Sequence, residues 1–250
     1  MQGGDTAKQI ARWTALGALF LLPVMPLIVA NSLFFPFITG KAYFLRILVE
    51  VAFCAWAVLA LVDKAYRPRF SWIGASVLAF VSWMFVANLF ALNVAKAFWS
   101  NSERMEGWIL LVHLLAFFVV ASCVLRVEKK WRAWFLTSLG VSILLLFYGL
   151  FQLAGVFDVH QGLTRTDATL GNSAYFAIYL LFNTFIAGWL AFTEPRPWLK
   201  YSLLVLAVVE ATFIFFTQTR GTILGLVGAL SLAAILVVFF RGSRARKYAT

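Results

Sequence analysis

The run WFLTSLGVSILLLFYGLFQLAGVF (residues 134–157) is followed by the polar segment DVHQGLTRTDATLGNS (158–173) and then by a second apolar run, AYFAIYLLFNTFIAGWLAF (174–192). Each apolar run has about the 20 residues that an α-helix needs to cross the hydrocarbon core of a bilayer. The polar segment is one of the few hydrophilic places in the chain. This pattern predicts two membrane-spanning helices joined by a polar loop at one membrane surface.

The composition of the whole chain agrees with a membrane protein. Of its 250 residues, 63% are hydrophobic and 12% are charged, whereas about 25% of the residues of a soluble domain are charged. No polar block is long enough to fold separately. We therefore expect an all-α integral membrane protein in which residues 1–250 form a single polytopic membrane domain.

Eight apolar runs are long enough, or nearly so, to span a bilayer. They cover residues 14–36, 43–62, 71–92, 108–125, 134–157, 174–192, 201–216 and 222–240. Pro195 and Pro197, which cannot continue a helix, separate two of these runs. An even number of crossings, about eight, places both termini on the same side of the membrane.

The basic residues predict the orientation. The net charge of +11 is what a membrane protein gains from lysines and arginines retained in its cytoplasmic loops, so it does not indicate a nucleic acid partner. With a cytoplasmic N-terminus, the cytoplasmic side collects all but six of the 21 lysines and arginines. The outer six are Lys41, Arg46, Lys96, Arg104, Arg165 and Arg220. We therefore expect both termini in the cytoplasm.

The sequence contains no pattern typical of a metal or nucleotide site. Cys54 and Cys123 lie in separate apolar runs without CxxC spacing, so they predict neither a disulfide framework nor a zinc site. HExxH, DxD and P-loop motifs do not occur. We expect no metal and no cofactor.

The loop that contains Arg165 has two interpretations. Asn172 or Ser173 would be an ordinary N-cap for the following helix, and Gly171 an ordinary turn residue. A helix start also attracts anions, because its N–H groups are unpaired and its dipole end is positive. Beside such a helix start, Arg165 would complete a phosphate cradle.

The other outer arginines have similar alternatives. Arg220 follows Thr217 and Thr219 in a short turn, where it either snorkels to the interface or faces a cavity or a partner, as charges retained near the membrane interior usually do. Arg104 either pairs with Glu103 or Glu106 or contacts a ligand. Both readings remain open for each arginine.

Four other titratable residues have no clear functional role. Three lie inside apolar runs, and the fourth, His160, lies in the outer loop. Glu50 could pair with Arg46 one helical turn earlier. Glu210, inside an apolar run, is either a functional carboxylate or a structural hydrogen-bonding group to another helix. We expect His113 to be a satisfied core histidine, and His160 is a weak candidate for a general base.

Three motifs together resemble one protein family. Arg165 with Thr169-Leu170-Gly171-Asn172, followed by Thr217-x-Thr219-Arg220-Gly221, is similar to the O-antigen ligase and O-antigen polymerase superfamily, and so is Arg104-Met105-Glu106-Gly107 before the fourth run. Members of that family are multi-pass proteins of the bacterial inner membrane. At its periplasmic face they transfer a glycan from undecaprenyl diphosphate to a hydroxyl of a glycan, lipid or protein acceptor, without a metal.

The resemblance implies roles for individual residues. Arg165 and Arg220 would be the catalytic residues that hold the diphosphate. The substrate-binding residues would be Arg104, Thr169, Gly171, Asn172, Thr217 and Thr219. Family members carry more spans and a large outer loop with a histidine after this point, so we expect the chain to correspond to the N-terminal portion of such a fold. Ser173-Ala174 also stands where the family often has Pro-Asn.

Two other classes of function remain open. A small transporter or lipid flippase would explain Glu50, Glu210 and His113 inside apolar runs, although the two related halves that many transporters show are not visible. A non-catalytic assembly component would bind the lipid-linked glycan without turnover.

Overall fold

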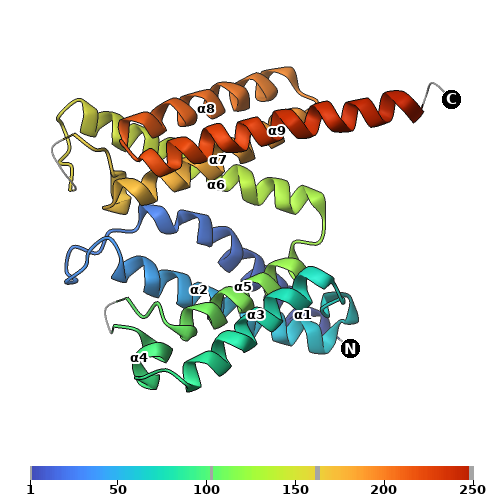
Figure 1. The fold of residues 1–250 in the computed structure, drawn as a ribbon. Helices are drawn as coiled ribbons and strands as arrows, with labels where there is room; N and C mark the ends of the chain where they lie inside the picture. Colours follow the sequence, from blue (N-terminus) through green and yellow to red (C-terminus); the bar gives the residue numbers. More distant parts are fainter. Residues whose placement is uncertain (1, 102–103, 161–163, 248–250) are drawn as a thin grey trace. The chain divides into compact units, whose positions relative to one another are not determined.

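The computed structural model describes residues 2–101, 104–160 and 164–247, which form helices and connecting loops without a β-strand (Figure 1). The chain divides into two compact units, Met1–Val141 and Ser142–Thr250, and each is described by itself. The all-helical fold confirms the predicted class of secondary structure. A single membrane domain over residues 1–250 stays a prediction.

The first unit contains five complete helices and the beginning of a sixth. They are α1 (Gln2–Leu21), α2 (Thr39–Val62), α3 (Trp72–Leu89), α4 (Val94–Trp99), α5 (Trp108–Val124) and α6 (Glu128–Leu153), with the short 3₁₀ helices η1 (Leu22–Leu27) and η2 (Lys64–Tyr66). Pro23 and Pro26 lie in η1, and α1 ends there because proline cannot supply the N–H of an α-helical hydrogen bond.

Small residues hold α1 against α2. Ala11, Ala15 and Ala18 of α1 and Ala52 and Ala55 of α2 are all buried in one apolar cluster. Small side chains let two helix backbones approach closely, and they are enriched where membrane helices meet. The same cluster takes larger side chains from α2 and α5, namely Val49, Leu59, Val120, Val124 and Leu125.

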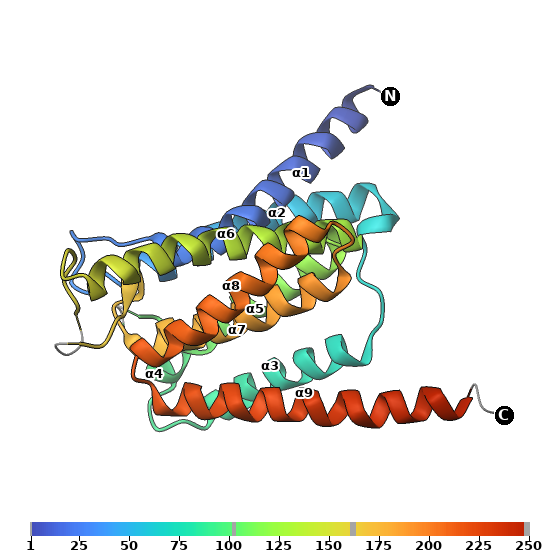
Figure 2. The same cartoon turned by 90° about the horizontal axis from the view of Figure 1, so that it is seen from above.

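The second unit contains the end of α6, then η3 (Ala168–Leu170), α7 (Ser173–Thr193), α8 (Pro197–Phe216) and α9 (Arg220–Lys247). The α7 and α8 helices form a hairpin, and both views show them side by side (Figures 1 and 2). The end of α6 approaches α8 at Gly149, where an added Cβ would lie 2.8 Å from the ring of Phe213. A larger residue than glycine would therefore force the Phe213 ring to shift.

Among the described residues, six helices are long and apolar enough to cross a membrane. They cover Asp5–Leu27, Thr39–Val62, Trp72–Leu89, Glu128–Leu153, Ser173–Thr193 and Pro197–Phe216. Large apolar side chains such as Trp83, Phe182 and Val208 point outward from these helices, as they do where lipid is the solvent. The chain is therefore a multi-pass helical membrane protein.

The remaining two apolar runs also form helices, but the apolar segments of these helices are shorter. They are Trp108–Val124 and, within the described residues, the apolar segment Arg220–Leu236 of α9. The number of eight crossings and the cytoplasmic location of both termini remain predictions.

Candidate functional site

Gln152, in the last turn of α6, fixes the polar loop that follows it. Its Nε2 donates hydrogen bonds to the carbonyl oxygen of Asp158 (2.8 Å) and to Oδ1 of Asp167 (2.7 Å). Its Oε1 accepts from the backbone N–H groups of Asp167 (3.2 Å) and Ala168 (2.9 Å). These four contacts use the whole hydrogen-bonding capacity of the amide. The loop is therefore folded back onto the end of α6.

Asp167 is fully buried, with 0% of its surface exposed, and it holds His160. Its Oδ2 accepts a hydrogen bond from the backbone N–H of His160 (3.0 Å) and lies 3.3 Å from Nδ1 of the same ring. A carboxylate only accepts hydrogen bonds, so Nδ1 is the donor in this contact. The His160 side chain is 34% exposed. A buried carboxylate behind a solvent-accessible imidazole is the arrangement of an oriented acid–base pair.

Arg165 connects the same loop to the turn between α8 and α9. Its Nε donates a hydrogen bond to the carbonyl oxygen of Thr217 (3.2 Å), and a terminal nitrogen lies 3.5 Å from the hydroxyl of Thr219. Beside it, Nε2 of Gln218 donates to the hydroxyl of Thr164 (3.0 Å). The structure thus brings Arg165 to the turn that immediately precedes Arg220.

The α8–α9 turn is shaped by its two threonines. The buried hydroxyl of Thr217 donates to the carbonyl oxygen of Ile214 (2.6 Å), and the carbonyl oxygen of Thr219 accepts from the N–H groups of Thr222 and Ile223 (both 3.1 Å). Arg220 is the first residue of α9 and is exposed. Within the described residues its side chain makes no hydrogen bond or ion pair, so this guanidinium is available to an anion.

The start of α7 confirms the structural interpretation of Asn172. Its Oδ1 accepts a hydrogen bond from the backbone N–H of Ala174 (2.8 Å), which makes Asn172 the N-cap. Gly171 has a φ of 64°, a left-handed conformation that glycine adopts without strain. Ser173 is the first residue of the helix rather than its cap, and Thr169 is buried in η3.

Two hydroxyls near this helix start are buried without a partner. Neither Oγ1 of Thr166 nor Oγ of Ser173 has a hydrogen-bond partner within the described residues. Buried polar atoms nearly always have one. A polar ligand that reached the loop would find two unpaired hydroxyls there.

Arg104 lies in the first unit, where Arg46 holds its backbone. Terminal nitrogens of the largely buried Arg46 donate to the carbonyl oxygens of Arg104 (3.0 Å) and Met105 (2.6 Å) and to the Met105 sulfur (2.8 Å). The guanidinium of Arg104 lies 5.9 Å from the ring centroid of Phe35, within the range of a cation–π contact. Glu103, the first possible ion-pair partner of Arg104, lies outside the described residues.

Gly107, the last residue of the motif that begins at Arg104, is required for packing. An added Cβ would lie 2.4 Å from the carbonyl oxygen of Phe98, closer than a carbon and an oxygen atom can approach. Gly107 is also the N-cap residue of α5. This part of the motif therefore has a structural reason to be glycine.

His113, Glu50 and Glu210, which lie inside helices, each contact a polar group of the protein. His113 donates through Nδ1 to the carbonyl oxygen of Ile109 (2.7 Å) and contacts Oε1 of Glu50 through Nε2 (3.0 Å). This confirms that His113 is satisfied, and it shows that the predicted pairing of Glu50 with Arg46 was wrong, because the packing of α5 on α2 supplies a nearer partner. Glu210 accepts a hydrogen bond from the hydroxyl of Ser142 (2.6 Å), which confirms the bond to another helix.

Sequence reasoning missed the structural roles of Gln152, Asp167 and Arg46, which organise these loops. Gln152 could have been noticed as a polar residue inside an apolar run, and such residues usually bond within the protein. The described residues contain no group of three or more His, Cys, Asp or Glu side chains that could hold a metal ion. The polar end of the second unit therefore consists of arginine, threonine and amide groups and one Asp–His pair.

The fold and this polar end define a multi-pass helical membrane protein whose second unit presents Arg165 and Arg220 at the turn that leads into α9. Comparison with known protein families, with characterised proteins and with solved structures found no match to this chain. Its function is therefore inferred from its own residues.

Proposed function

We propose that this protein binds a glycan carried on undecaprenyl diphosphate and transfers it to a hydroxyl acceptor, as the O-antigen ligases and polymerases that its motifs resemble do. The acceptor is a glycan, a lipid or a protein hydroxyl. The observation that supports the proposal most is the contact of Arg165 with Thr217 and Thr219, because it places one arginine at the turn from which Arg220 projects.

The two arginines suit a diphosphate leaving group. When the acceptor hydroxyl attacks the anomeric carbon, the bond from that carbon to the diphosphate oxygen breaks and the electron pair remains on the diphosphate. Guanidinium groups meet phosphate oxygens in pairs and stay charged, and a fixed positive charge at the place where negative charge develops lowers the barrier. In this proposal Arg165 and Arg220 stabilise the leaving group, as a metal ion does in other transferases.

Neighbouring residues bind the rest of the carrier in this proposal. Asn172 uses Oδ1 as the N-cap of α7, so its Nδ2 group can donate to a phosphate oxygen. Thr169, Gly171, Thr217 and Thr219 shape the loop and the turn around the diphosphate. Arg104 lies in the first unit, and its role as a substrate-binding residue is what the resemblance implies.

His160 activates the acceptor in this proposal. Asp167 holds Nδ1–H of the ring, so the acceptor hydroxyl gives its proton to Nε2 while its oxygen bonds to the anomeric carbon. Such general-base catalysis contributes typically 10²–10⁴-fold. In the family that the motifs resemble, the histidine that activates the acceptor lies in an outer loop further along the chain. In this proposal His160, held by Asp167, takes that role.

The proposed location is the bacterial inner membrane, with eight spans and both termini in the cytoplasm. The polar end at Arg165 and Arg220 then faces the periplasm, where lipid-linked glycans are assembled. The low number of basic residues in the outer loops supports this orientation.

Substitution of the two arginines tests the proposal. Arg165→Ala and Arg220→Ala should each lower the transfer of glycan from a labelled undecaprenyl diphosphate donor at least 10²-fold, as expected for loss of a group that stabilises transition-state charge. Lys200→Ala, which removes an exposed charge near the start of α8, is the control. Membrane insertion and thermal stability are measured in parallel. Full transfer activity in both arginine variants would exclude the proposal.

One observation favours a proton-coupled transporter as the second candidate. Nε2 of His113 in α5 lies 3.0 Å from Oε1 of Glu50 in α2, so an imidazole and a carboxyl group from two helices meet. Ionisable groups inside membrane helices mark proton relays in pumps and transporters. Loss of proton-dependent flux in Glu50→Gln, with glycan transfer absent in the unaltered protein, would favour this function. Carrier binding without turnover would instead indicate a non-catalytic assembly component.

A further inference from the structure

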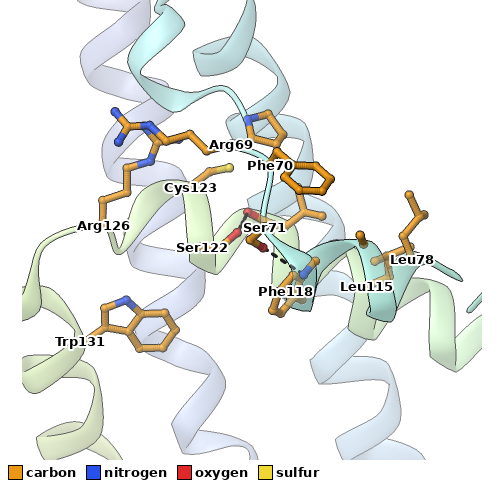
Figure 3. Close-up of a pocket in the computed structure, with 14 residues that line it drawn as sticks. Arg69, Phe70, Ser71, Leu78, Leu115, Phe118, Ser122, Cys123, Arg126 and Trp131 are labelled. Carbon is orange, nitrogen blue, oxygen red and sulfur yellow. Dashed lines mark hydrogen bonds between the residues drawn. The ribbon is translucent and has the colours of Figure 1, made fainter. Parts of the chain in front are cut away.

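A pocket of about 790 Å³ lies in the first unit, between α3, α5 and the start of α6 (Figure 3). This volume falls within the roughly 300–1,000 Å³ of small-molecule sites. The pocket begins at the loop between α2 and α3 and extends along α3 and α5. Because its lining lies within Met1–Val141, the pocket is independent of the polar end of the second unit.

Two arginines give one end of the pocket a positive charge. Arg69 and Arg126 both line the pocket, and Figure 3 shows them at its Cys123 end, away from Leu78. Arg126 donates hydrogen bonds to the carbonyl oxygens of Ala65 and Arg67, which fixes its guanidinium. Arg69 makes no hydrogen bond or ion pair within the described residues. The residues that line the pocket include no Asp or Glu, so this end favours an anion, and phosphate suits arginine best.

The other end of the pocket is apolar. Leu78 of α3 and Leu115, Phe118 and Val119 of α5 line it, and Figure 3 shows Leu78, Leu115 and Phe118 away from the two arginines. A soluble anion would leave these side chains without a partner. A ligand that fills the whole pocket therefore carries both an anionic group and a hydrocarbon chain.

The two helices are fixed farther along, so the apolar end is a formed space. Nε1 of Trp108, the first residue of α5, donates to the carbonyl oxygen of Val81 in α3 (3.0 Å). The rings of Phe85 and Trp108 lie 4.8 Å apart. At the pocket mouth Phe70 and Trp72 are exposed and contact each other edge to face, as aromatic side chains do at the membrane interface.

We propose that this pocket binds an anionic phospholipid, with its phosphate between Arg69 and Arg126 and one acyl chain along α3 and α5. Basic pockets between membrane helices on the cytoplasmic side are known to bind anionic headgroups. The distribution of basic residues places this end of α3 and α5 on that side. A zwitterionic lipid carries no net charge to match the two arginines.

Lipid binding to the purified full-length chain tests the proposal. The delipidated protein in a non-ionic detergent is titrated with phosphatidylglycerol or phosphatidylcholine, and bound lipid is measured by native mass spectrometry. We expect preferential binding of phosphatidylglycerol. Arg69→Gln should weaken it about fivefold, since a basic residue near an anionic lipid contributes about 1 kcal/mol. Glycerol phosphate should not compete, because it lacks the acyl chain.

Two further variants make the result specific. Lys64→Gln removes a positive charge from the same interhelical loop at a residue that does not line the pocket, and it should bind phosphatidylglycerol like the unaltered protein. Ala75→Phe places a bulky side chain in the pocket and should weaken phosphatidylglycerol binding without removing a charge. Equal binding of the two lipids, unchanged binding in Arg69→Gln, or an equal loss in Lys64→Gln would overturn the proposal.

Discussion

The buried carboxylate of Asp167 lies 3.3 Å from Nδ1 of His160, and Gln152 fixes that carboxylate from α6 by a 2.7 Å hydrogen bond. The imidazole is therefore oriented by two residues that are themselves fully or largely buried. An exposed histidine on a free loop would have no such orientation. Because of these contacts, His160 and Asp167 form an oriented acid–base pair.

Asp167→Asn should abolish most glycan transfer without abolishing carrier binding. Asparagine has nearly the shape of aspartate but carries no charge, so it neither fixes the tautomer of His160 nor stabilises the imidazolium. We expect a decrease of about 10²-fold or more in transfer rate. Asp158→Asn, an exposed carboxylate of the same loop, is the matched control. The role of the pair would be refuted if Asp167→Asn and His160→Gln both retained the full transfer rate.

Gly107→Ala should destabilise the first unit by about 1–3 kcal/mol, the usual cost of forcing extra atoms into a packed site. Its new Cβ would lie 2.4 Å from the carbonyl oxygen of Phe98, and backbone atoms must move to relieve that contact. Gly140→Ala in α6 has no atom within 4 Å of the new Cβ and serves as the control. Thermal unfolding in detergent measures both variants, and equal melting temperatures would contradict the packing argument.

Ser142→Ala should destabilise the second unit by about 1–3 kcal/mol, because it removes the partner of a buried carboxyl group. Oε1 of Glu210 accepts its hydrogen bond from Ser142, and Oε2 has no partner within the described residues. Combining Ser142→Ala with Glu210→Met should recover much of the loss, since an apolar side chain needs no partner. A double-mutant cycle measures the coupling. Additive losses would show that the two residues do not act as a pair.

The pair of Lys8 and Asp63 predicts a dependence of stability on pH. The hydrogen bond from Lys8 (2.8 Å) and the one from the N–H of Ala65 lower the pKa of Asp63 below its ordinary value. This stabilisation is present above the unfolded pKa of about 3.9 and is lost as the pH falls through the lower folded pKa. Asp63→Asn should therefore lower the melting temperature slightly at pH 7 and leave it unchanged at a pH below the folded value.

Measurements at two pH values distinguish this effect from a general loss of stability. The pair is accessible to solvent, and exposed ion pairs contribute little, so the difference at pH 7 should be small and should shrink in high salt. Asp5→Asn, which removes an acid from α1, the helix that carries Lys8, is the control. A difference in melting temperature that is the same at both pH values would rule out the linkage.

The sequence predicts a structural feature well where the interactions that cause the feature are local. Long apolar runs predict helices because the backbone groups of a chain in lipid must bond within the segment, and seven of the eight runs coincide with helices. The first run, residues 14–36, is wrong at its end, because the helical structure there stops at Leu27. The N-cap at Asn172 was also predictable, because capping involves residues two or three positions apart. Pairings across the fold were not predictable in this way, and Glu50 shows why. Its predicted partner was one helical turn away, whereas its actual partner, His113, lies on α5.

The sequence by itself determined that this chain is a helical membrane protein with polar segments around Arg165 and Arg220, because hydropathy and proline positions act over one helix at a time. Only the tertiary structure decided that Arg165 bonds to Thr217, that Asp167 holds His160, and that Arg69 and Arg126 line one pocket. The first two contacts rest on a loop that folds back onto Gln152, and the third on how α5 packs against α3. Such packing depends on side chains far apart in the sequence, so no local pattern encodes it.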